Sequence, residues 1–513
     1  MDRNFGEMIE RNAGIRPDKV AVKCKGLSLT FEDLNNRTNR LSNSLLKMGL
    51  GKGDRVAVLS RNCSQYVELY WAIAKAGLII VPINFRLIGK EISFLVNDSG
   101  AKAFVSGKEF VSGVESVRGE MPVLTHLIVI GPPSGDWMSY DELIQMGGED
   151  LPPSIVRVED VLCIMYTSGT TSFPKGAVIT HGNWLASARY HCGAFNIGEG
   201  DTCLIVNPLF HVAATWPLYS HFYIGGSVVL LPSFDLEEVL STLDKEKITT
   251  FNTVPTIINE LLQSPTIREF DFRHLKWIGY GGSTMPLDVL GAAVEIFGNK
   301  FFHVYGLTES NGAVTRLPPE DHLRKDASGS LSKIRSCGRA IDPIGVRIVD
   351  ESGRDKKPHE IGEIVVKGDC VINEYRGLPE VTAQTIQHGW LRTGDLGTID
   401  EEGYFYVVDR KKDIIISGGE NISSREVEDV IHRHPGVLEA AVIGVTHPKW
   451  GEAVKAVIVK KKGCEVIREE IENLCRKNLA GFKCPKSIDF VDSLPKSSTG
   501  KILKREIRKH LGL

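Results

Sequence analysis

Between residues 54 and 82 the chain alternates a short apolar run, an amphipathic segment and a second apolar run. The runs 54–60 and 78–82 are rich in Val, Ile, Leu and Ala, and residues 66–76 have helical spacing between them. Short apolar runs are typical of buried strands, and strands that alternate with helices form parallel sheets. The same alternation returns between residues 202 and 304. The sequence therefore predicts an α/β fold built on parallel sheets.

The pattern changes after residue 337, where short strands and turns replace the helices. A charged break, Asp-Arg-Lys-Lys-Asp, follows at residues 409–413. Beyond it, helices and strands alternate in a segment of domain size. We therefore expect a large N-terminal domain at 1–409, with a β-rich subdomain at about 338–409, and a small mobile α+β domain at 410–513.

Composition limits the classes of function. The net charge is −3, which argues against a nucleic-acid binder, although residues 411–513 carry an excess of Lys and Arg. Ten cysteines are scattered without metal-binding spacing, and the N-terminus has no apolar leader. These features predict a cytoplasmic protein with reduced thiols and no integral membrane segment. Peripheral membrane contact and a homodimer stay open.

A loop rich in hydroxyl groups follows the apolar run 161–165. Residues 166–176 read Tyr-Thr-Ser-Gly-Thr-Thr-Ser-Phe-Pro-Lys-Gly. Backbone N–H groups, hydroxyls and one ammonium at a strand end suit a polyphosphate. The loop does not follow the P-loop pattern, because Lys175 precedes Gly176 and follows Pro174. The sequence therefore predicts nucleotide binding outside the P-loop NTPases.

Five motifs follow one another in a fixed order. They are 166–176, 207–211 (Asn-Pro-Leu-Phe-His), 305–310 (Tyr-Gly-Leu-Thr-Glu-Ser), 393–395 (Thr-Gly-Asp) with 409–410 (Asp-Arg), and 495–501 (Pro-Lys-Ser-Ser-Thr-Gly-Lys). Together they resemble the AMP-forming adenylate synthetases, which include acyl-CoA synthetases, luciferases and adenylation domains. The resemblance covers the whole chain and is nearest to the fatty acyl-CoA synthetases.

The resemblance implies that a carboxylate attacks the α-phosphate of ATP and releases pyrophosphate, after which the thiol of CoA takes the acyl group. Both steps bring anions together, so positioning and charge neutralisation must supply the catalysis. It implies catalytic roles for Lys501, Thr308, Glu309 and His211. Glu309 is also the expected Mg²⁺ ligand, since a carboxylate beside phosphates needs a cation.

The resemblance also implies the residues that hold the cofactor and co-substrate. Phosphate, adenosine and CoA contacts are expected at Thr167, Ser168, Gly169, Thr170, Thr171, Lys175, Gly281, Gly282, Ser283, Tyr305, Gly306, Asp395, Arg410, Gly418, Gly419 and Lys483. Lys412 occupies the hinge position about which the C-terminal domain would rotate between the two half-reactions. Ser172 stands where family members usually have Gly, which puts the fine geometry of the phosphate loop in question.

The acid itself is harder to infer. Candidate lining residues of the acyl pocket are Ala213, Ala214, Trp216 and Val254. Because no charged pair stands out near residues 207–216, we expect an apolar medium- to long-chain acid. An aryl-CoA ligase acting on a benzoate or hydroxycinnamate is the alternative within this chemistry. Two further classes stay open: an acyl-AMP ligase that loads a carrier protein, and a non-catalytic binding protein.

Overall fold

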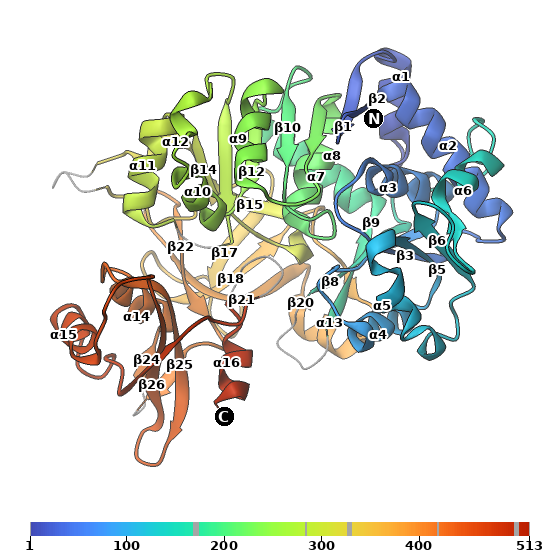
Figure 1. Cartoon of the computed structure of the whole chain (residues 1–513). Helices are drawn as coiled ribbons and strands as arrows, with labels where there is room; N and C mark the ends of the chain where they lie inside the picture. Colours follow the sequence, from blue (N-terminus) through green and yellow to red (C-terminus); the bar gives the residue numbers. More distant parts are fainter. Residues whose placement is uncertain are drawn as a thin grey trace. The chain divides into compact units, whose positions relative to one another are not determined.

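The computed structural model describes residues 2–167, 174–282, 285–325, 331–417, 420–496 and 502–511. The chain divides into two compact units. Unit 1 comprises Met1–Val346 and Val366–Leu391, and unit 2 comprises Arg347–Val365 and Arg392–Leu513. Figure 1 shows the elements of both in sequence colours.

Unit 1 contains a nine-stranded sheet among its described residues. Its central strands, from β14 to β1, are parallel, and β15, β16 and β2 are antiparallel additions at the two edges. The spatial order is β16 (Arg339–Ala340), β15 (Gly312–Leu317), β14 (Phe301–Leu307), β13 (Trp277–Gly281), β12 (Thr250–Thr253), β10 (Thr202–Ile205), β11 (Ser227–Leu230), β1 (Val20–Cys24) and β2 (Leu27–Thr30).

A second sheet of unit 1 has eight strands in the described part. Strands β8 to β7 are parallel, while β9 pairs antiparallel with β8 and β19 pairs antiparallel with β9. The spatial order is β19 (Glu374–Tyr375), β9 (Lys175–Thr180), β8 (Val161–Thr167), β4 (Ile79–Pro82), β3 (Arg55–Leu59), β5 (Ala101–Gly107), β6 (His126–Ile130) and β7 (Met138–Ser139).

Helices cover the faces of both sheets of unit 1 (Figure 1). They are α1 (Glu7–Ile15), α2 (Phe31–Lys47), α3 (Ser64–Ala76), α4 (Gly89–Ser99), α5 (Val111–Glu115), α6 (Tyr140–Met146), α7 (His181–Ala194), α8 (Val212–Ile224), α9 (Leu236–Lys245), α10 (Pro255–Leu262), α11 (Leu287–Phe297), α12 (Pro319–His322) and α13 (Pro379–Thr385). Short 3₁₀ turns are η1 (Lys108–Phe110), η2 (Arg118–Glu120), η3 (Ile267–Glu269) and η4 (Thr308–Ser310).

The local sequence explains these boundaries. Thr30 caps α2 by accepting a hydrogen bond from the Asp33 amide, and the Asp33 carboxylate accepts one from the Thr30 amide. The helix buries the apolar stripe that includes Leu34, Leu41 and Leu45. Helix α3 ends at Gly77, whose φ of 69° suits glycine.

Helices α7 and α8 link the two sheets of unit 1. Helix α7 contacts β9 in the eight-stranded sheet and β15 in the nine-stranded sheet, while α8 packs on β10, β11 and β12. One hydrophobic core runs through this layer and includes Trp71, Trp184 and Tyr219. On the opposite face of the nine-stranded sheet, α9, α10 and α11 bury a separate core that includes Phe251 and Tyr280.

Two smaller sheets follow in the described chain. One has the order β17 (Gly345–Val349), β18 (Gly362–Lys367), β21 (Trp390–Ile399) and β20 (Ile386–Gln387), with β22 (Phe405–Arg410) paired to β21. The other lies in unit 2 and has the order β24 (Glu420–Ile422), β23 (Ile415–Ser417), β26 (Gly451–Lys460) and β25 (Val437–His447), with β27 (Ser487–Val491) paired to β26. Helices α14 (Ser424–Ile431), α15 (Arg468–Asn478) and α16 (Lys504–His510) complete unit 2.

The α/β fold on parallel sheets is thus confirmed. The segments expected as buried strands and helices at 54–82 and 202–304 form β3, α3, β4 and the core of the nine-stranded sheet. The antiparallel strands β9, β15 and β19 were not expected, because strand direction is decided by pairing partners that are distant in sequence. None of the described helices combines the length and the apolar character needed to cross a membrane.

Three fully buried histidines and the partly exposed His211 lie on or beside α7 and α8. Burial lowers the pKa of each to about 4; they are His181, His191, His211 and His221. His221 is typical: Nδ1 lies 2.7 Å from the Pro217 carbonyl and Nε2 lies 2.9 Å from the Thr250 hydroxyl. Nδ1 therefore donates to Pro217 and neutral Nε2 accepts from Thr250. A proton added to Nε2 would reverse the second bond and place a positive charge in the buried core, which burial disfavours.

These histidines predict loss of stability in mild acid. An unfolded histidine has a pKa of about 6.5, so between pH 6.5 and 4 the unfolded chain binds protons that the native chain does not. The free energy of unfolding therefore falls as pH falls through this window, by up to about 1.4 kcal/mol per pH unit for each histidine. Urea unfolding at pH 7, 6 and 5 measures this slope.

The variant His221→Gln should make the slope shallower, since it removes one of the titrating groups. The matched control is His274→Gln, because His274 is exposed and its removal should leave the slope as it is. An unchanged slope in His221→Gln would contradict the assignment of the acid sensitivity to the buried histidines.

Candidate active site

Several of the predicted residues of unit 1 lie at one edge of the nine-stranded sheet. Four adjacent parallel strands, β10, β12, β13 and β14, have their carboxyl ends there. These ends lead to His211, Val254, Gly281 and Tyr305 respectively. The crevice outside the carboxyl ends of parallel strands is where open α/β sheets bind ligands. The topology thus brings motifs that are far apart in sequence to one edge.

The turn that carries Thr308 and Glu309 is fixed by the residue that follows it. Asn311 is fully buried with a φ of 55°, and its amide accepts from the Trp184 indole (2.9 Å) and donates to the Cys370 carbonyl (2.7 Å). Its own carbonyl accepts hydrogen bonds from the hydroxyls of Ser187 and Tyr219. Asn311 therefore anchors this turn to α7, to α8 and to the segment at 370.

Glu309 is connected to Lys175 through a residue that sequence reasoning missed. The Tyr375 hydroxyl donates to Glu309 Oε1 at 2.8 Å, and Lys175 Nζ lies 4.9 Å from the centre of the Tyr375 ring. Burial, with the neighbouring Glu309 carboxylate, raises the pKa of the Tyr375 phenol. The phenol therefore stays protonated and keeps donating to Glu309. Only the pairing of β19 with β9 places Tyr375 here, and its local sequence carries no signal of the role.

The ends of the phosphate loop face each other across a hairpin. Thr167 on β8 pairs with Lys175 on β9, and Tyr166 pairs with Gly176. The hairpin thus holds Thr167 and Lys175 side by side at the end that carries the loop. The loop residues between them that were predicted to bind phosphate lie outside the described residues: Ser168, Gly169, Thr170 and Thr171.

His211 caps α8 and is neutral. Its Nδ1 accepts a hydrogen bond from the Ala213 amide at 3.1 Å, and burial lowers the pKa of the imidazole to about 4. The remaining proton of the neutral ring therefore sits on Nε2. Beside it, Phe210 packs edge-on against Phe85 at 5.4 Å. His211 can thus act as a neutral hydrogen-bond donor and not as a cation.

At three of the predicted glycines the structure disfavours any side chain, because an added Cβ would clash or because φ is positive. An added Cβ at Gly306 would lie 2.0 Å from the Gly312 carbonyl oxygen, and one at Gly281 would lie 2.7 Å from the Val304 oxygen. Gly282 has a φ of 81°, which favours glycine. Tyr305 is half-buried at the bulge between β14 and β15. Ser283 lies outside the described residues.

The candidate residues of the acyl pocket differ in their surroundings. Trp216 is 3% exposed and packs on Phe195 (5.2 Å) and His191 (4.7 Å), and its ring is parallel to that of Trp277. Ala214 is also buried, whereas Ala213 and Val254 are partly exposed. Trp216 is therefore a core residue that closes the space beneath α8, and the two partly exposed residues lie nearer the strand ends.

In unit 2 the structure brings Asp395 and Arg410 together as cross-strand neighbours on β21 and β22. Arg410 Nε lies 2.6 Å from Asp395 Oδ1, and the carboxylate is nearly fully buried. The Asp395 amide donates to Thr393 Oγ1, which in turn donates to the Ile364 carbonyl. A buried ion pair supported in this way holds the carboxylate in one position.

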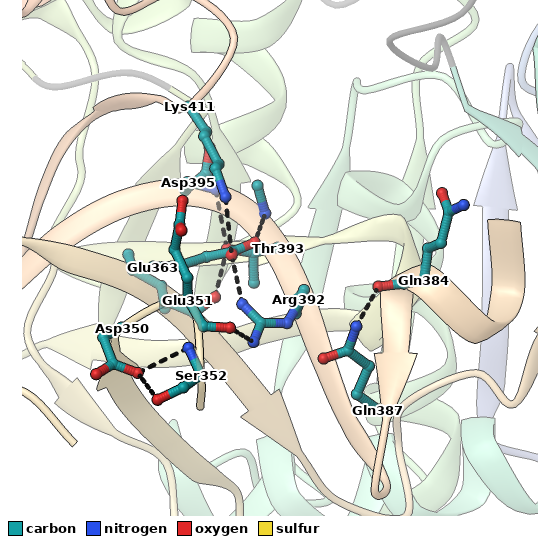
Figure 2. A network of polar contacts seen from close by, with 12 residues as sticks. Asp350, Glu351, Ser352, Glu363, Gln384, Gln387, Arg392, Thr393, Asp395 and Lys411 are labelled. Atoms are coloured by element: carbon teal, nitrogen blue, oxygen red, sulfur yellow. Dashed lines mark hydrogen bonds and ion pairs between the residues drawn. The ribbon is translucent and has the colours of Figure 1, made fainter. Parts of the chain in front are cut away.

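A second carboxylate supports the same part of β21 (Figure 2). Glu363 accepts from the Gly394 amide at 3.2 Å and from Arg392 Nη1 at 2.8 Å, and Lys411 Nζ lies 3.9 Å from it. Gly394 lies within β21 with a φ of 71°, a backbone angle that favours glycine. The Thr-Gly-Asp motif is thus part of strand β21 and not a surface loop.

The remaining predicted residues of unit 2 lie among other charges. Lys483 Nζ is 2.8 Å from both carboxylate oxygens of Glu426, so a phosphate that binds it must replace this ion pair. Burial lowers the pKa of Lys412, and the nearby positive charges of Arg410, Arg505 and Arg508 lower it further, while Asp413 opposes them. Gly418, Gly419 and Lys501 lie outside the described residues.

Glu309 fits a magnesium ligand by its chemistry. Among the described residues no cluster of three His, Cys, Asp or Glu side chains could hold a metal by itself. Magnesium in nucleotide sites needs only one or two carboxylates, because phosphates and water supply its other ligands. Tyr375 occupies one oxygen of Glu309, and the described chain shows no partner on the other. That oxygen could bind a cation.

Comparison with known proteins shows the family to which the chain belongs. The family model described as AMP-binding enzyme matches residues 9–376, and the model of its C-terminal domain matches residues 426–501. A feruloyl-CoA synthase of an Amycolatopsis species is 37% identical over 513 residues and is covered over its full length, as is this chain.

Two further proteins have similar coverage. A long-chain fatty-acid–CoA ligase of Mycobacterium tuberculosis is 36% identical, with 99% of this chain and 98% of that protein covered. The crystal structure of the anthranilate CoA ligase AuaEII in complex with anthranoyl-AMP has a TM-score of 0.89 and 28% identity, covering 99% of this chain and 97% of that one. The chain therefore belongs to the AMP-binding enzyme family, and it is an AMP-forming acyl- or aryl-CoA ligase.

Proposed function

We propose that the enzyme adenylates a carboxylic acid at the strand ends of unit 1 and then transfers the acyl group to CoA. In the first step the carboxylate oxygen attacks the α-phosphorus of ATP, and pyrophosphate leaves. In the second step the CoA sulfur attacks the acyl carbonyl carbon, and AMP leaves. The observation that carries the proposal is the Lys175–Tyr375–Glu309 cluster, which joins a cation and a carboxylate from two motifs.

Each group of this cluster has a task that its chemistry suits. Lys175 neutralises phosphate charge at the mouth of the β8–β9 hairpin, and Thr308 donates to the α-phosphate. Glu309 would hold Mg²⁺, which would neutralise the phosphates when bound. Neutral His211 orients the acid with its Nε2 proton. The predicted glycines allow the nucleotide to approach the backbone.

The unit 2 residues complete the proposal. Asp395 accepts hydrogen bonds from the ribose hydroxyls, and Arg410, which already fixes that carboxylate, contacts ribose or phosphate. Lys501 serves adenylation, whereas Gly418, Gly419 and Lys483 serve CoA. Lys412 is the hinge between domains 1–409 and 410–513. The hinge assignment agrees with its place directly after β22, beside the ion pair that would hold nucleotide.

The sequence and the packing of the structure favour different classes of acid substrate. The absence of charge at residues 207–216 favoured a medium- to long-chain fatty acid, and the relatives include both fatty-acid and aromatic-acid ligases. The tryptophans Trp216 and Trp277, each 3% exposed, fill the space beneath α8 where a long chain would need to pass. We therefore favour a compact aromatic acid and keep the fatty acid as the second candidate.

The deciding assay is pyrophosphate release from ATP with a panel of aromatic and C6–C16 aliphatic acids, with and without CoA. Acid-dependent release that turns over only with CoA is expected, and the best acid identifies the substrate class. Release that stops near one turnover with CoA but continues with an acyl-carrier protein would make the carrier the acceptor. No release with any acid would contradict ligase activity.

Substitution of Lys501 should separate the half-reactions. Lys501→Ala should lower acid-dependent pyrophosphate release by at least about 100-fold, since it removes a charge that stabilises the transition state. Formation of acyl-CoA from supplied acyl adenylate should stay within about threefold of wild type. Lys496→Ala is the control, because Lys496 lies in the same motif but pairs with Glu439. Equal loss of both half-reactions in Lys501→Ala would contradict the two-conformation assignment.

Removal of one hydroxyl should test the role of Tyr375. Tyr375→Phe keeps the ring beside Lys175 but leaves Glu309 without its donor, and a hydrogen bond to a charged group contributes about 1.5–3 kcal/mol. We expect at least about tenfold slower adenylation at limiting Mg²⁺, with partial recovery when Mg²⁺ is raised. Tyr375→Leu, which also removes the ring, should be slower and should raise the KM for ATP.

The control for this prediction is Tyr406→Phe in unit 2. The Tyr406 hydroxyl donates to the Asp400 carboxylate at 2.9 Å, so the substitution removes the same kind of bond. Its Mg²⁺ dependence should match that of wild type. If Tyr375→Phe also matched wild type at every Mg²⁺ concentration, Tyr375 would be only a packing residue.

A further inference from the structure

One face of β13 changes abruptly in side-chain size. Alternate residues of a strand share a face, and from the carboxyl end inward the face toward α8 carries Gly281, Gly279 and Trp277. The contact of Trp277 with Trp216 of α8 identifies this face. This face thus carries no side chains at its last two positions, Gly279 and Gly281, and an indole at Trp277, four residues before the strand end.

Asn252 lies beside this face on the neighbouring strand. It pairs with Gly279 in the parallel register of β12 and β13, and it is 5% exposed. An added Cβ on Gly279 would lie 2.6 Å from Asn252 Oδ1, so the amide oxygen occupies the space that glycine leaves. The absence of a side chain at Gly279 therefore allows the Asn252 amide to lie across β13.

The contacts of Asn252 fix which way its amide points. Its Nδ2 donates to the Ala213 carbonyl at 3.0 Å, at the start of α8. Its backbone carbonyl accepts from Asn207 Nδ2 at 3.0 Å, so the strand is held as well. The Oδ1 atom therefore faces away from Ala213, and it has no donor in the part of the chain that the structure describes.

An unpaired buried carbonyl oxygen is unfavourable. Leaving such an acceptor without a donor costs about 1–3 kcal/mol, and an apolar side chain of similar size would avoid the cost. Gly281 and Gly279 are two positions apart along the strand, or about 6.6 Å at 3.3 Å per residue. An aromatic ring with a substituent spans about this length. The oxygen thus lies where the far end of a compact acid would reach.

We propose that Asn252 Oδ1 accepts a hydrogen bond from a hydroxyl or amino group on the body of the acid. The substrate class is then a hydroxy- or amino-substituted aromatic acid, whose ring lies at the Gly281 end of β13 and whose substituent points to the Asn252 amide over Gly279. This inference rests on the proposed ligase function and on the placement of the acid beside α8. It makes Asn252 a specificity-determining residue that contacts substrate away from the reacting carboxylate.

The test compares acids that differ by one donor. The enzyme is assayed by pyrophosphate release in the presence of CoA with 4-hydroxycinnamate against 4-methylcinnamate, and with 3-hydroxy-, 4-hydroxy- and 4-aminobenzoate against the methyl analogues. A methyl group has nearly the size of a hydroxyl but donates no hydrogen bond. We expect kcat/KM to favour the best donor over its methyl analogue by at least about tenfold, the size of one hydrogen bond.

Two variants test whether the preference for hydrogen-bond donors depends on Asn252. Asn252→Leu should reduce the donor preference to about one, because it removes the acceptor while keeping the volume. Thr253→Val is the matched control: Thr253 is the next residue, and its buried hydroxyl also lacks a partner in the described chain. Its side chain points to the opposite face of β12, so the donor preference should persist.

Three results would overturn the inference. They are a wild-type enzyme that shows no donor preference in any pair, a preference that survives Asn252→Leu, and a preference lost equally in Thr253→Val. The wild-type comparison decides the matter even if Asn252→Leu fails to fold. Ligation of methyl analogues or fatty acids with equal or higher efficiency would refute the role of Asn252 while leaving the ligase function intact, whereas no release with any acid would refute the ligase function itself.

Discussion

The buried side chain of Asn311 is the constraint on which the site of unit 1 depends. A non-glycine residue with positive φ is unfavourable unless its surroundings hold it. Here the surroundings are Trp184, the Cys370 carbonyl, and the hydroxyls of Ser187 and Tyr219. Because these groups come from α7, α8 and the segment at 370, one residue joins the layer between the sheets to the turn of Glu309. The segment at 370 then continues into β19, which carries Tyr375 to Glu309.

Neutral and charged side chains lie in different parts of the candidate site, and this arrangement suits a reaction between anions. The histidines packed along α7 and α8 are neutral, since burial lowers the pKa of each to about 4. The charged residues of the site lie elsewhere. In unit 1 Lys175 begins β9 and Glu309 lies in the turn after β14, and in unit 2 Asp395 of β21 pairs with Arg410 at the end of β22. Each is held by a neighbour before substrate arrives. Such preorganisation lowers the cost of rearranging dipoles and charges during the reaction.

Much of the fold was predictable because its strands are short apolar runs and its helices are amphipathic, and both patterns are local. The Thr30 cap and the apolar stripe of α2 are examples, as is the αL glycine that ends α3. The direction of β9, β15 and β19 could not be predicted in this way, because pairing partners are chosen over long sequence separations. The motif residues of the site could be recognised because each motif is also a local pattern. The contacts that these residues make could not be predicted from the sequence.

The sequence by itself determined the elements, the parallel core and the order of the five motifs, and through them the reaction class. Only the tertiary structure decided which side chains meet. Tyr375 donates a hydrogen bond to Glu309 although 66 positions separate them in the sequence. Asn252 lies over Gly279 because β12 and β13 are neighbouring strands whose register pairs these two residues. The sequence around Tyr375 or Asn252 contains no local pattern from which these contacts could be predicted. Hydrogen bonds between distant segments are set by packing, which depends on the whole core and not on the residues nearby in sequence.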